Sequence, residues 1–254
     1  MASVPRIYVG SDNIENGYAT VCGSDAKHVL LVMRKKVGDT VCICDMHGMS
    51  YNAVIRSAGD GFFTVELGEG IKRVSEIGFP VKVYQCMPKG DKLDTVVQKA
   101  VELGASEIIA VMSERCVSRP DGKAFEKRLE RLGRISESAA AQCGREFVPA
   151  VRGIISYREA IDEMKESGTA FVCYEGDGTV SLQTLLREKF PQGVEEDALP
   201  TVSIVIGSEG GFSLKEAQRA REAGMICVGL GPRILRTETA SSFVLSALVY
   251  ELEL

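Results

Sequence analysis

The chain has no tryptophan, only two histidines and few aromatic residues, which make up 6% of its 254 positions. With so few histidines, a serine–histidine or cysteine–histidine catalytic pair and a structural zinc site are both disfavoured. The eight cysteines are scattered along the chain without a Cys-x-x-Cys pair. Free cysteines pack as small hydrophobic side chains, so we expect buried thiols, no disulfide framework and no metal site.

Long apolar runs are also absent from the sequence. Stretches such as residues 29–33 and 108–112 are far shorter than the roughly 20 residues that cross a membrane. The first residues, from Met1 to Arg6, lack the apolar core of a signal peptide. We therefore expect no membrane segment and a cytoplasmic protein.

What the chain does have is the composition of a globular protein. Hydrophobic residues make up 45% and charged residues 26% of the sequence, and the formal net charge is −5. This net charge does not exclude a polyanionic partner, because basic residues can gather on one face of a protein. The length allows one large domain or two smaller ones, and we expect two.

Residues 1–75 predict a small β-barrel or sandwich. Strand-like runs at 6–9, 18–21, 40–45, 51–57 and 62–67 are separated by turn-forming residues such as Asp45-Met46-His47-Gly48. One helix is expected to interrupt them. Ser24 is its predicted N-cap, His28, Leu31 and Val32 lie along it, and the basic cluster Arg34-Lys35-Lys36 follows it.

Residues 76–254 predict an α/β domain built on a parallel sheet. Strand-like runs at 81–86, 108–112, 170–174, 202–206 and 226–230 are apolar on both faces, as strands buried between two layers are. Helical patterns at 92–103 and around 125–135 lie between them. The alternation of strands and helices favours helices on both faces of the sheet.

The sharpest motif is the glycine-dense loop Gly207-Ser208-Glu209-Gly210-Gly211-Phe212, which follows a strand and precedes a helix opened by the capping box Ser213-x-x-Glu216. Ligands bind at the carboxyl ends of parallel strands, where glycines allow close approach of the backbone. The spacing fits neither the dinucleotide-binding pattern nor the P-loop. The alternative is a tight turn that needs glycine only for its backbone angles.

A second motif follows the last strand, with the sequence Leu230-Gly231-Pro232-Arg233-Ile234-Leu235-Arg236-Thr237-Glu238-Thr239-Ala240. Two arginines in an otherwise apolar turn are costly if they are buried without partners. We infer that they serve a function. In the alternative, Arg233 faces solvent and Arg236 pairs with Glu238 or Glu209 to fix the turn.

Together the two motifs resemble the C-terminal signature loops of the SPOUT class of S-adenosylmethionine-dependent RNA methyltransferases. They closely resemble those of the RsmE family, which methylates N3 of a uridine in bacterial 16S ribosomal RNA. The sequence departs from the family at Ser208, where proline is usual, so we expect a less rigid loop. Further matches, in the family's order, are Arg6, His28, Arg34-x-x-x-Gly38-Asp39, Lys89-Gly90-Asp91-Lys92, Gln98-Lys99-x-x-Glu102-Leu103-Gly104, Ser113-Glu114-Arg115, Glu137-x-Ala139-x-x-Gln142-x-x-Arg145 and Pro149.

The resemblance implies a trefoil-knotted SPOUT domain at residues 76–254, preceded by an RNA-binding barrel similar to a PUA domain at residues 1–75. It also implies a homodimer that acts on 16S ribosomal RNA of the small ribosomal subunit, and S-adenosylmethionine held in a bent form by three loops. The residues that it assigns to this cofactor are Tyr174, Glu175, Gly207, Glu209, Gly210, Gly211, Leu230, Gly231, Ile234, Leu235 and Arg236. Those that it assigns to RNA are Arg6, Arg34, Lys89, Lys99, Arg115 and Arg145.

For the chemistry we expect roles for Arg236 and Glu209. As N3 of uridine loses its proton, negative charge spreads onto O2 and O4, where the guanidinium group of Arg236 would stabilise the transition state. Glu209 is the candidate proton acceptor, with a pKa that a dry loop would raise. Contact of Glu209 with the cofactor or with Arg236 is an alternative, and so is transfer of the proton to water.

Two other functions compete with methyl transfer. One is a non-catalytic RNA-binding or ribosome-assembly factor of the same fold, against which the intact glycines and Arg236 argue. The other is a flavodoxin-like nucleotide enzyme, which needs a phosphate-binding loop that the sequence lacks.

Overall fold

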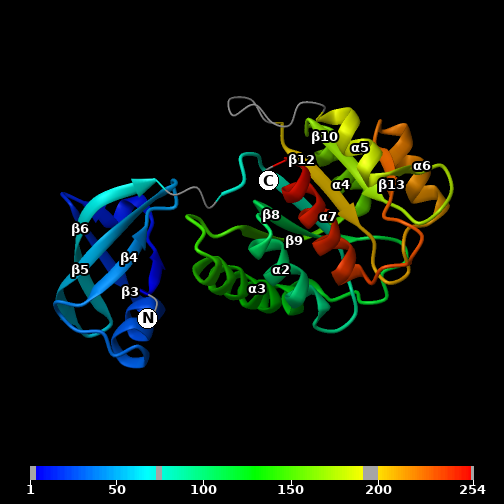
Figure 1. The fold of residues 1–254 in the computed structure, drawn as a ribbon. Helices are drawn as coiled ribbons and strands as arrows, with labels where there is room; N and C mark the ends of the chain where they lie inside the picture. The colour runs from blue at the N-terminus through cyan, green and yellow to red at the C-terminus, as the bar shows by residue number, and fades with distance from the viewer. Residues whose placement is uncertain (1–3, 73–75, 191–199, 253–254) are drawn as a thin grey trace. The chain divides into compact units, whose positions relative to one another are not determined.

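The computed structural model of the chain describes residues 4–72, 76–190 and 200–252 (Figure 1). These residues form two compact units. Unit 1 runs to Glu76 and also contains Ala140–Val148, whereas unit 2 comprises Ile77–Ala139 and the chain from Pro149 onward. The sequence led us to expect two contiguous domains, so the contribution of Ala140–Val148 to unit 1 is a feature that the structure adds.

Unit 1 is built on a six-stranded sheet with the order β1-β4-β5-β6-β3-β2. The β1–β4 pair is parallel and the other neighbouring strands pair antiparallel. Its elements are β1 (Arg6–Tyr8), η1 (Ser11–Asn13), β2 (Ile14–Glu15), β3 (Tyr18–Cys22), α1 (Gly23–Lys27), η2 (His28–Val32), β4 (Thr40–Cys44), β5 (Met49–Gly59) and β6 (Phe62–Lys72).

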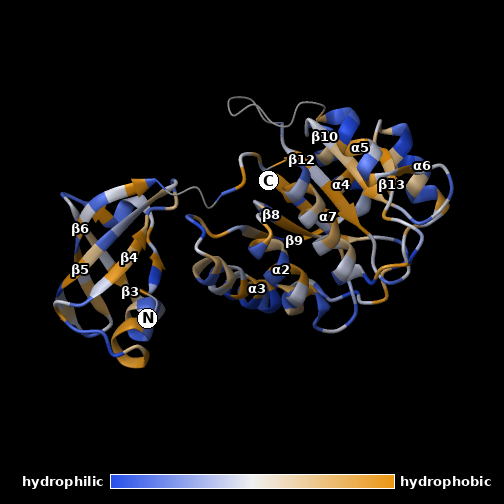
Figure 2. Ribbon diagram, in the orientation of Figure 1, coloured by the Kyte–Doolittle hydropathy of each residue, from blue (hydrophilic) through white to orange (hydrophobic). Residues whose placement is uncertain are grey.

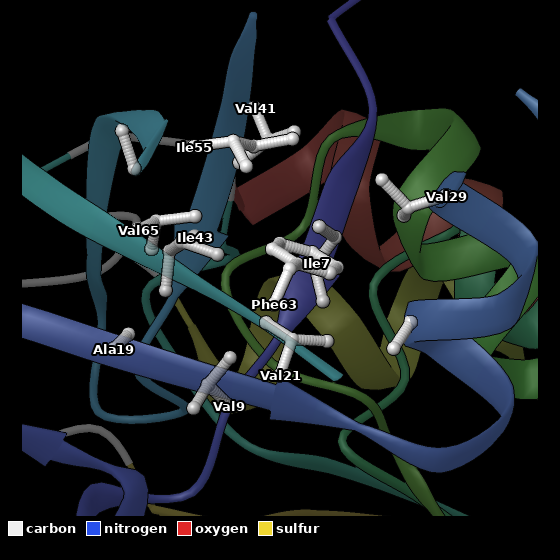
Figure 3. Packing of buried hydrophobic residues seen from close by; sticks show 12 residues of the cluster. Ile7, Val9, Ala19, Val21, Val29, Val41, Ile43, Ile55, Phe63 and Val65 are labelled. Atoms are coloured by element: carbon white, nitrogen blue, oxygen red, sulfur yellow. The ribbon is translucent and has the colours of Figure 1, made fainter. Parts of the chain in front are cut away.

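The hydrophobic core of unit 1 comes from the inward-facing residues of these strands (Figure 3). Val41 and Ile43 of β4 and Phe63 and Val65 of β6 are fully buried, because every second side chain of a strand points to the same face. The predicted turn after β4 is present. The Asp45 carboxylate accepts hydrogen bonds from the backbone amides of His47 at 2.8 Å and of Met49, the first residue of β5, at 3.1 Å.

The predicted helix is present in unit 1, but its beginning and its second half differ from the expectation. It begins at Gly23, so Ser24 lies inside α1 instead of serving as its N-cap. Its second half, η2, is a wider π-helical turn in which the amide of Met33 donates to the carbonyl of His28 at 2.9 Å. This turn leaves Leu31 and Val32 exposed.

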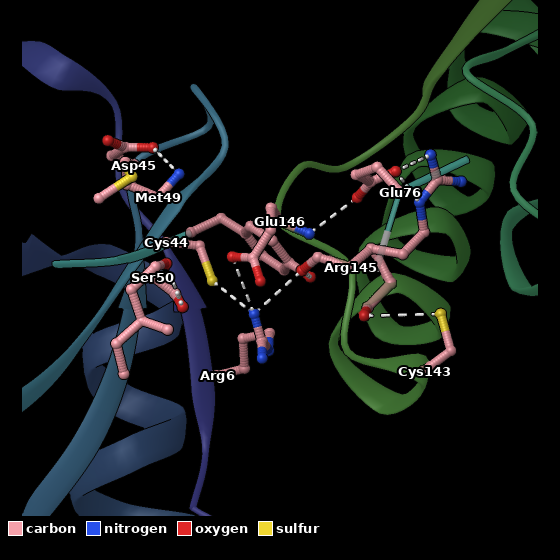
Figure 4. A network of polar contacts seen from close by, with 12 residues as sticks. Arg6, Cys44, Asp45, Met49, Ser50, Glu76, Cys143, Arg145 and Glu146 are labelled. Carbon is pink, nitrogen blue, oxygen red and sulfur yellow. Dashed lines mark hydrogen bonds and ion pairs between the residues drawn. The ribbon is translucent and has the colours of Figure 1, made fainter. Parts of the chain in front are cut away.

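A buried polar network joins β1 and β4 to the segment 140–148 within unit 1 (Figure 4). Arg6 Nη1 donates to Cys44 Sγ at 3.0 Å, to the Arg145 carbonyl at 3.2 Å and to Glu146 Oε2 at 3.2 Å. The Arg145 guanidinium in turn pairs with the Glu76 carboxylate at 2.6 Å. Glu76 also accepts the backbone amide of Glu146, at 2.8 Å. Two ion pairs thus hold the ends of unit 1 together.

Unit 2 contains a seven-stranded parallel sheet with the order β11-β13-β10-β12-β7-β8-β9. β9 and β11 were not predicted, because β9 carries an arginine and a glycine and β11 has only two residues. The elements are β7 (Val81–Cys86), α2 (Lys92–Glu102), β8 (Glu107–Met112), α3 (Gly122–Cys143), β9 (Ala150–Ser156), α4 (Tyr157–Met164), β10 (Thr169–Cys173), β11 (Val180–Ser181), α5 (Leu182–Lys189), β12 (Val202–Ile206), α6 (Leu214–Glu222), β13 (Ile226–Gly229) and α7 (Thr237–Leu252).

The centre of this sheet is buried and mostly apolar. All residues of β12 are buried, as expected for a strand in the middle of a parallel sheet. Figure 2 shows the hydrophobic colour concentrated on these inner strands, with hydrophilic residues on the exposed sides of the helices. No helix in the described ranges is long and apolar enough to cross a membrane.

The buried ion pair of unit 1 predicts a measurable loss of stability on mutation. Replacing Arg6 by methionine would leave the Glu146 carboxylate, whose side chain is 0% exposed, without its cationic partner. We expect Arg6→Met to lower the free energy of unfolding by about 3 kcal/mol or more, because breaking a buried pair leaves an uncompensated charge. Chemical denaturation followed by circular dichroism measures the effect.

Arg56→Met is the matched control. Arg56 pairs with Glu66 on the surface, where the two side chains are 54% and 44% exposed, so its loss is expected to cost less than about 1 kcal/mol. Equal losses of stability in the two variants would contradict the role given to Arg6.

Candidate functional site

Three loops of unit 2 meet at the carboxyl edge of its parallel sheet. Strands β10, β12 and β13 lie side by side, with Cys173 opposite both Ile206 and Val228. The segments that follow these strands therefore emerge together, at the edge where parallel sheets bind ligands. They enclose a pocket of about 600 Å³. Its lining residues are Lys92, Cys173, Tyr174, Glu175, Thr179, Ile206, Gly207, Ser208, Glu209, Gly211, Gly229, Leu230, Gly231, Pro232, Arg233, Ile234, Leu235, Arg236, Thr237 and Ala240.

The loop after β12 is a tight turn that also shapes the pocket. Gly211 has a φ of 62°, and its amide donates to the Ser208 carbonyl at 3.0 Å. A side chain at Gly211 would collide with the carboxylate of Glu175, which also lines the pocket. Glycine is therefore needed at this position for its backbone angle, and a side chain there would displace the Glu175 carboxylate from the pocket wall. The predicted capping box of Ser213 and Glu216 is confirmed directly after the loop.

Gly210 is the one residue predicted to bind the cofactor that does not line the pocket. It faces Arg115: a Cβ at Gly210 would lie 2.9 Å from the Arg115 Cβ, and Arg115 Nη1 donates to the Gly210 carbonyl at 3.1 Å. Ser208, the departure from the family pattern, is buried, and its hydroxyl donates to the Arg115 carbonyl at 3.5 Å. Arg115, in the segment that follows β8, therefore holds residues 208–210 in place through these hydrogen bonds.

Thr237, the first residue of α7, fixes the third loop to the first. Its hydroxyl donates to the Gly207 carbonyl at 2.6 Å and accepts from Gln85 Nε2 at 2.8 Å. Gln85 is fully buried near the end of β7 and also donates to the Cys86 carbonyl at 3.0 Å. Sequence reasoning gave neither residue a role, although an amide side chain near the end of a buried strand was a usable signal.

Lys92, and not Arg236, is the cationic partner of Glu209 and Glu238. Lys92 Nζ lies 2.6 Å from Glu209 Oε1 and 3.9 Å from Glu238 Oε2. The alternative in which Arg236 pairs with one of these carboxylates is therefore wrong. In the described part of the chain, Arg233 and Arg236 are exposed at the pocket and have no recorded hydrogen bond or ion pair through their side chains.

The pKa of Glu209 lies below its ordinary value, not above it. Partial burial, the largest single effect, raises the pKa. The hydrogen bond from Lys92, the amides of Glu209 itself and of Lys89, and the charge of Lys92 together outweigh it. The expectation of a raised pKa was wrong, because the loop holds the carboxylate against donors. A carboxylate of lowered pKa is a weaker proton acceptor, so the basis for Glu209 as the catalytic base is lost.

The loop after β10 forms the remaining wall. The guanidinium of Arg221 lies over the Tyr174 ring at 5.8 Å and donates to the Asp177 carbonyl at 2.7 Å. The pocket thus brings together every predicted cofactor residue except Gly210. In addition it includes residues that were not predicted, Lys92 and Thr237 among them.

The residues predicted to bind RNA fall into two groups. The guanidinium groups of Arg6 and Arg145 are buried and ion-paired, with side chains 8% and 3% exposed. Their assignment to RNA is corrected, since a buried guanidinium group that is paired with a carboxylate is not available to a phosphate. Arg34 in unit 1 and Lys89 and Arg115 in unit 2 are exposed. Lys99 is partly buried and pairs with Glu102 at 2.8 Å.

Metal binding finds no support in the side chains. Within residues 4–72, 76–190 and 200–252, no group of three or more histidine, cysteine, aspartate or glutamate residues is arranged to hold an ion. The cysteines of these ranges are free thiols, and most of them are buried.

Comparisons with known proteins agree with the pocket. Residues 75–249 match a family described as RNA methyltransferase domain. Ribosomal RNA small subunit methyltransferase E of Bacillus subtilis is 33% identical over 240 residues, which are 92% of this chain and 91% of that protein. The protein of the same name from Mycobacterium tuberculosis is 29% identical over 231 residues, 90% of this chain and 85% of that protein.

Solved structures give the same result. Ribosomal RNA small subunit methyltransferase E of Neisseria gonorrhoeae, bound to S-adenosyl methionine, has a TM-score of 0.81 and 30% identity, covering 98% of both chains. A protein of Legionella pneumophila in complex with its bound cofactor SAM has a TM-score of 0.84 and 25% identity, also over 98% of both chains.

The ion pair of Glu209 predicts a pH-dependent contribution to stability. Because the folded protein lowers its pKa, the ionised carboxylate stabilises the fold above the ordinary glutamate pKa, and this contribution is lost as the pH falls through the folded value. At pH 7 we expect Glu209→Gln to unfold more easily by no more than about 1 kcal/mol, because the pair is partly exposed. Below the folded pKa the difference is expected to vanish.

Denaturant unfolding of both proteins between pH 7 and pH 3 checks this. Glu175→Gln is the control, because Glu175 also lines the pocket but has no recorded ion pair in the described ranges. A Glu209→Gln difference that is constant over the whole pH range would show that the charge of Glu209 is not what stabilises the loop.

Proposed function

The chain belongs to the RNA methyltransferase family, in the group of ribosomal RNA small subunit methyltransferase E, and we propose that it methylates N3 of a uridine in 16S ribosomal RNA with S-adenosylmethionine. The observation that carries this proposal is the pocket of unit 2. Its walls are the three loops that the resemblance assigned to the cofactor. We propose the cytoplasm as the compartment, because ribosomal RNA is methylated where the ribosome assembles.

The residues of the pocket fit S-adenosylmethionine. A volume of about 600 Å³ is within the usual range for sites that bury a small molecule. Gly207 and Gly211 leave room for close approach, and Leu230 and Leu235 offer apolar surface. The carboxylate of Glu175, also on the wall, complements the positive charge of an ammonium or sulfonium group.

When bound, the cofactor supplies an electrophilic methyl group on a sulfonium. The protein's part is then to hold uridine N3 in line with that methyl and to stabilise the charge that grows on O2 and O4 as the proton leaves. Arg233 and Arg236 are the cationic side chains at the pocket that no carboxylate of the described ranges engages. Glu209 is tied to Lys92, so we assign it to holding the loop and facing the cofactor, and the proton to water.

Arg236 is the better placed of the two arginines. Its carbonyl accepts from the amides of Thr239 and Ala240 at 2.9 and 2.8 Å, and the next residue, Thr237, is buried and hydrogen-bonded on both sides. The backbone that carries Arg236 is thereby fixed. Arg233 precedes Ile234, which is 91% exposed, and has no comparable anchor.

The finer points of the fold are part of the same proposal. We propose that residues 76–254 are a SPOUT domain with a trefoil knot, and that residues 1–75 are a PUA-like RNA-binding domain. In support, the chain leaves β13, crosses to the loop of β12 at Thr237 and then packs α7 against α2. Unit 1 carries exposed basic residues, such as Arg34 in the loop between η2 and β4.

A homodimer is also proposed. Phe243 and Tyr250 on α7 are 44% and 71% exposed, and Ile234 beside the pocket is 91% exposed. Apolar side chains left in water on one helix and an adjoining loop are typical of an interface. A second copy that covers them would bring its surface close to Arg236.

Binding of S-adenosylhomocysteine, measured by titration calorimetry, tests the cofactor site. Gly211→Ala is expected to weaken it by about tenfold or more, because the new methyl group displaces the Glu175 carboxylate from its place on the pocket wall. Gly224→Ala is the control, since Gly224 needs a similar left-handed backbone (φ 84°) but has open space around its Cα. Equal affinities for the two variants, or no binding by the unaltered protein, would reject the pocket as the cofactor site.

Single-turnover methylation of 16S ribosomal RNA tests the role of Arg236. We expect Arg236→Ala to lower the rate by about 100- to 1,000-fold with little change in cofactor affinity, because its charge acts only in the transition state. Arg236→Lys is expected to recover part of the rate, and Arg233→Ala to lose less. If Arg236→Ala turns over at the normal rate once cofactor is bound, Arg236 is a scaffold residue. Cofactor binding without methylation by the unaltered protein would favour a non-catalytic factor.

A further inference from the structure

Unit 1 holds four large apolar side chains in water within seven residues of sequence. Leu31 is 72% exposed, Val32 68%, Met33 44% and Val37 60%. Single exposed apolar residues are ordinary on protein surfaces, but a cluster of them marks an interaction site. We call these four residues the apolar wedge. In Figure 2 the helical segment that carries η2 is hydrophobic in colour at the tip of unit 1.

The backbone of the apolar wedge is firmly held. Met33 donates to the carbonyl of His28 at 2.9 Å and Lys35 to that of Val29 at 3.0 Å. Arg34 adopts a φ of 56°, an angle that costs energy for a residue with a side chain. Such an angle persists only where its surroundings enforce it.

The inner side of the same segment packs into the core. Val29 is 1% exposed, and Leu30 packs against the hydrophobic cluster of unit 1. The apolar wedge is therefore not a loose tail whose exposure is incidental. Its side chains project from a rigid base, which lowers the entropy lost when a partner covers them.

Positive charge surrounds the apolar wedge. Lys27, Arg34 and Lys36 are exposed and Lys35 is partly exposed. The acidic residues of the segment are Asp25 and Asp39, and the Asp39 carboxylate already accepts the backbone amide of Lys36 at 2.8 Å. Among the described residues, none of the four cations has a recorded ion pair. The rim thus fits a polyanion.

We propose that the apolar wedge is an RNA-contacting surface, in which Leu31, Val32 and Met33 pack against the sugars and bases of folded ribosomal RNA while Arg34 and Lys36 contact its phosphates. The inference rests on the proposed function, because that function makes RNA the polyanion. The minor groove of an RNA helix is wide and shallow, and the bases of RNA loops are splayed out, so projecting apolar side chains can pack against either. The phosphate contacts then position the protein and the apolar wedge adds contact area.

The two kinds of contact have different salt dependence, and this permits a sharp test. Phosphate contacts release counterions, so each lost contact lowers the slope of log affinity against log salt by about 0.7 to 0.9. Apolar contacts release none, so their loss weakens binding equally at every salt concentration. A wedge variant and a charge variant are therefore expected to differ in pattern as well as in size.

The experiment measures the affinity of the full chain for a 16S ribosomal RNA transcript between 50 and 300 mM salt. Leu31→Ser/Val32→Ser is expected to bind about 10- to 100-fold more weakly with an unchanged slope, given the apolar area removed. Lys36→Gln is expected to reduce the slope. Ile71→Ser is the control, because Ile71 is an exposed aliphatic residue of unit 1 outside the apolar wedge. All variants are expected to unfold at the same denaturant concentration as the unaltered protein when followed by circular dichroism, which shows that unit 1 is folded in each of them.

The outcomes separate this inference from the proposed function. If the unaltered protein methylates RNA but Leu31→Ser/Val32→Ser binds it normally, the inference fails alone. If that variant instead changes the mass of the protein in solution, or its binding to anionic lipid vesicles, the apolar wedge serves a second copy or a membrane and the inference is overturned. RNA binding that depends on the apolar wedge without methylation would support the inference and reject the function. An unaltered protein that binds no RNA would overturn both.

Discussion

The pocket of unit 2 depends on one hydroxyl group. Thr237 donates to the carbonyl of Gly207 and accepts from Gln85, so a single side chain joins the ends of β7 and β12 to the start of α7. The three groups are buried or partly buried, where an unpaired polar atom costs about 1–3 kcal/mol. The loop that carries Arg236 therefore cannot leave the glycine loop without exposing or stranding these groups. The shape of the site follows from this constraint more than from the loops' own conformational preferences.

The charges around the pocket are arranged so that Lys92 engages the carboxylates and the arginines are left for a ligand. Glu209 and Glu238 both lie near Lys92 Nζ, although Glu238 is only two residues from Arg236 in sequence. Of the two contacts of Lys92 Nζ, the one to Glu209 is the shorter, at 2.6 Å against 3.9 Å to Glu238. Short, charge-assisted contacts are the stronger ones, so Glu209 is the main partner of Lys92. The guanidinium groups of Arg233 and Arg236 thus line the pocket without a carboxylate partner among the described residues. The same pairing lowers the pKa of Glu209 and makes its carboxylate a weaker proton acceptor.

Much of the site could be predicted because glycine and arginine motifs are local. The loop at Gly207–Gly211, the capping box at Ser213 and the turn at Leu230–Arg236 were all read from consecutive residues, and the pocket brings most of them together. The misses involve partners far apart in sequence. Arg145 meets Glu76 and Lys92 meets Glu209 only after folding, so no pattern of neighbouring residues could show that one arginine is buried or that one glutamate has a lowered pKa. The strand β9 was missed because an arginine and a glycine interrupt its apolar run, and its residues are at most partly buried at the edge of the sheet.

The assignment of Ala140–Val148 to unit 1 has a consequence for the order in which the protein is made. Arg6 and Glu76 emerge early from the ribosome, yet their partners in the network, Glu146 and Arg145, follow roughly seventy residues after the last strand of that unit. Domains generally fold as units during synthesis, the first ones first. The polar network of unit 1 can close only after all of β7, α2, β8 and α3 have been translated, because these elements lie between Glu76 and Arg145. We therefore expect a stage of synthesis in which the strands of unit 1 have been translated but residues 140–148 have not. Chaperones are expected to bind the nascent chain most readily during this stage.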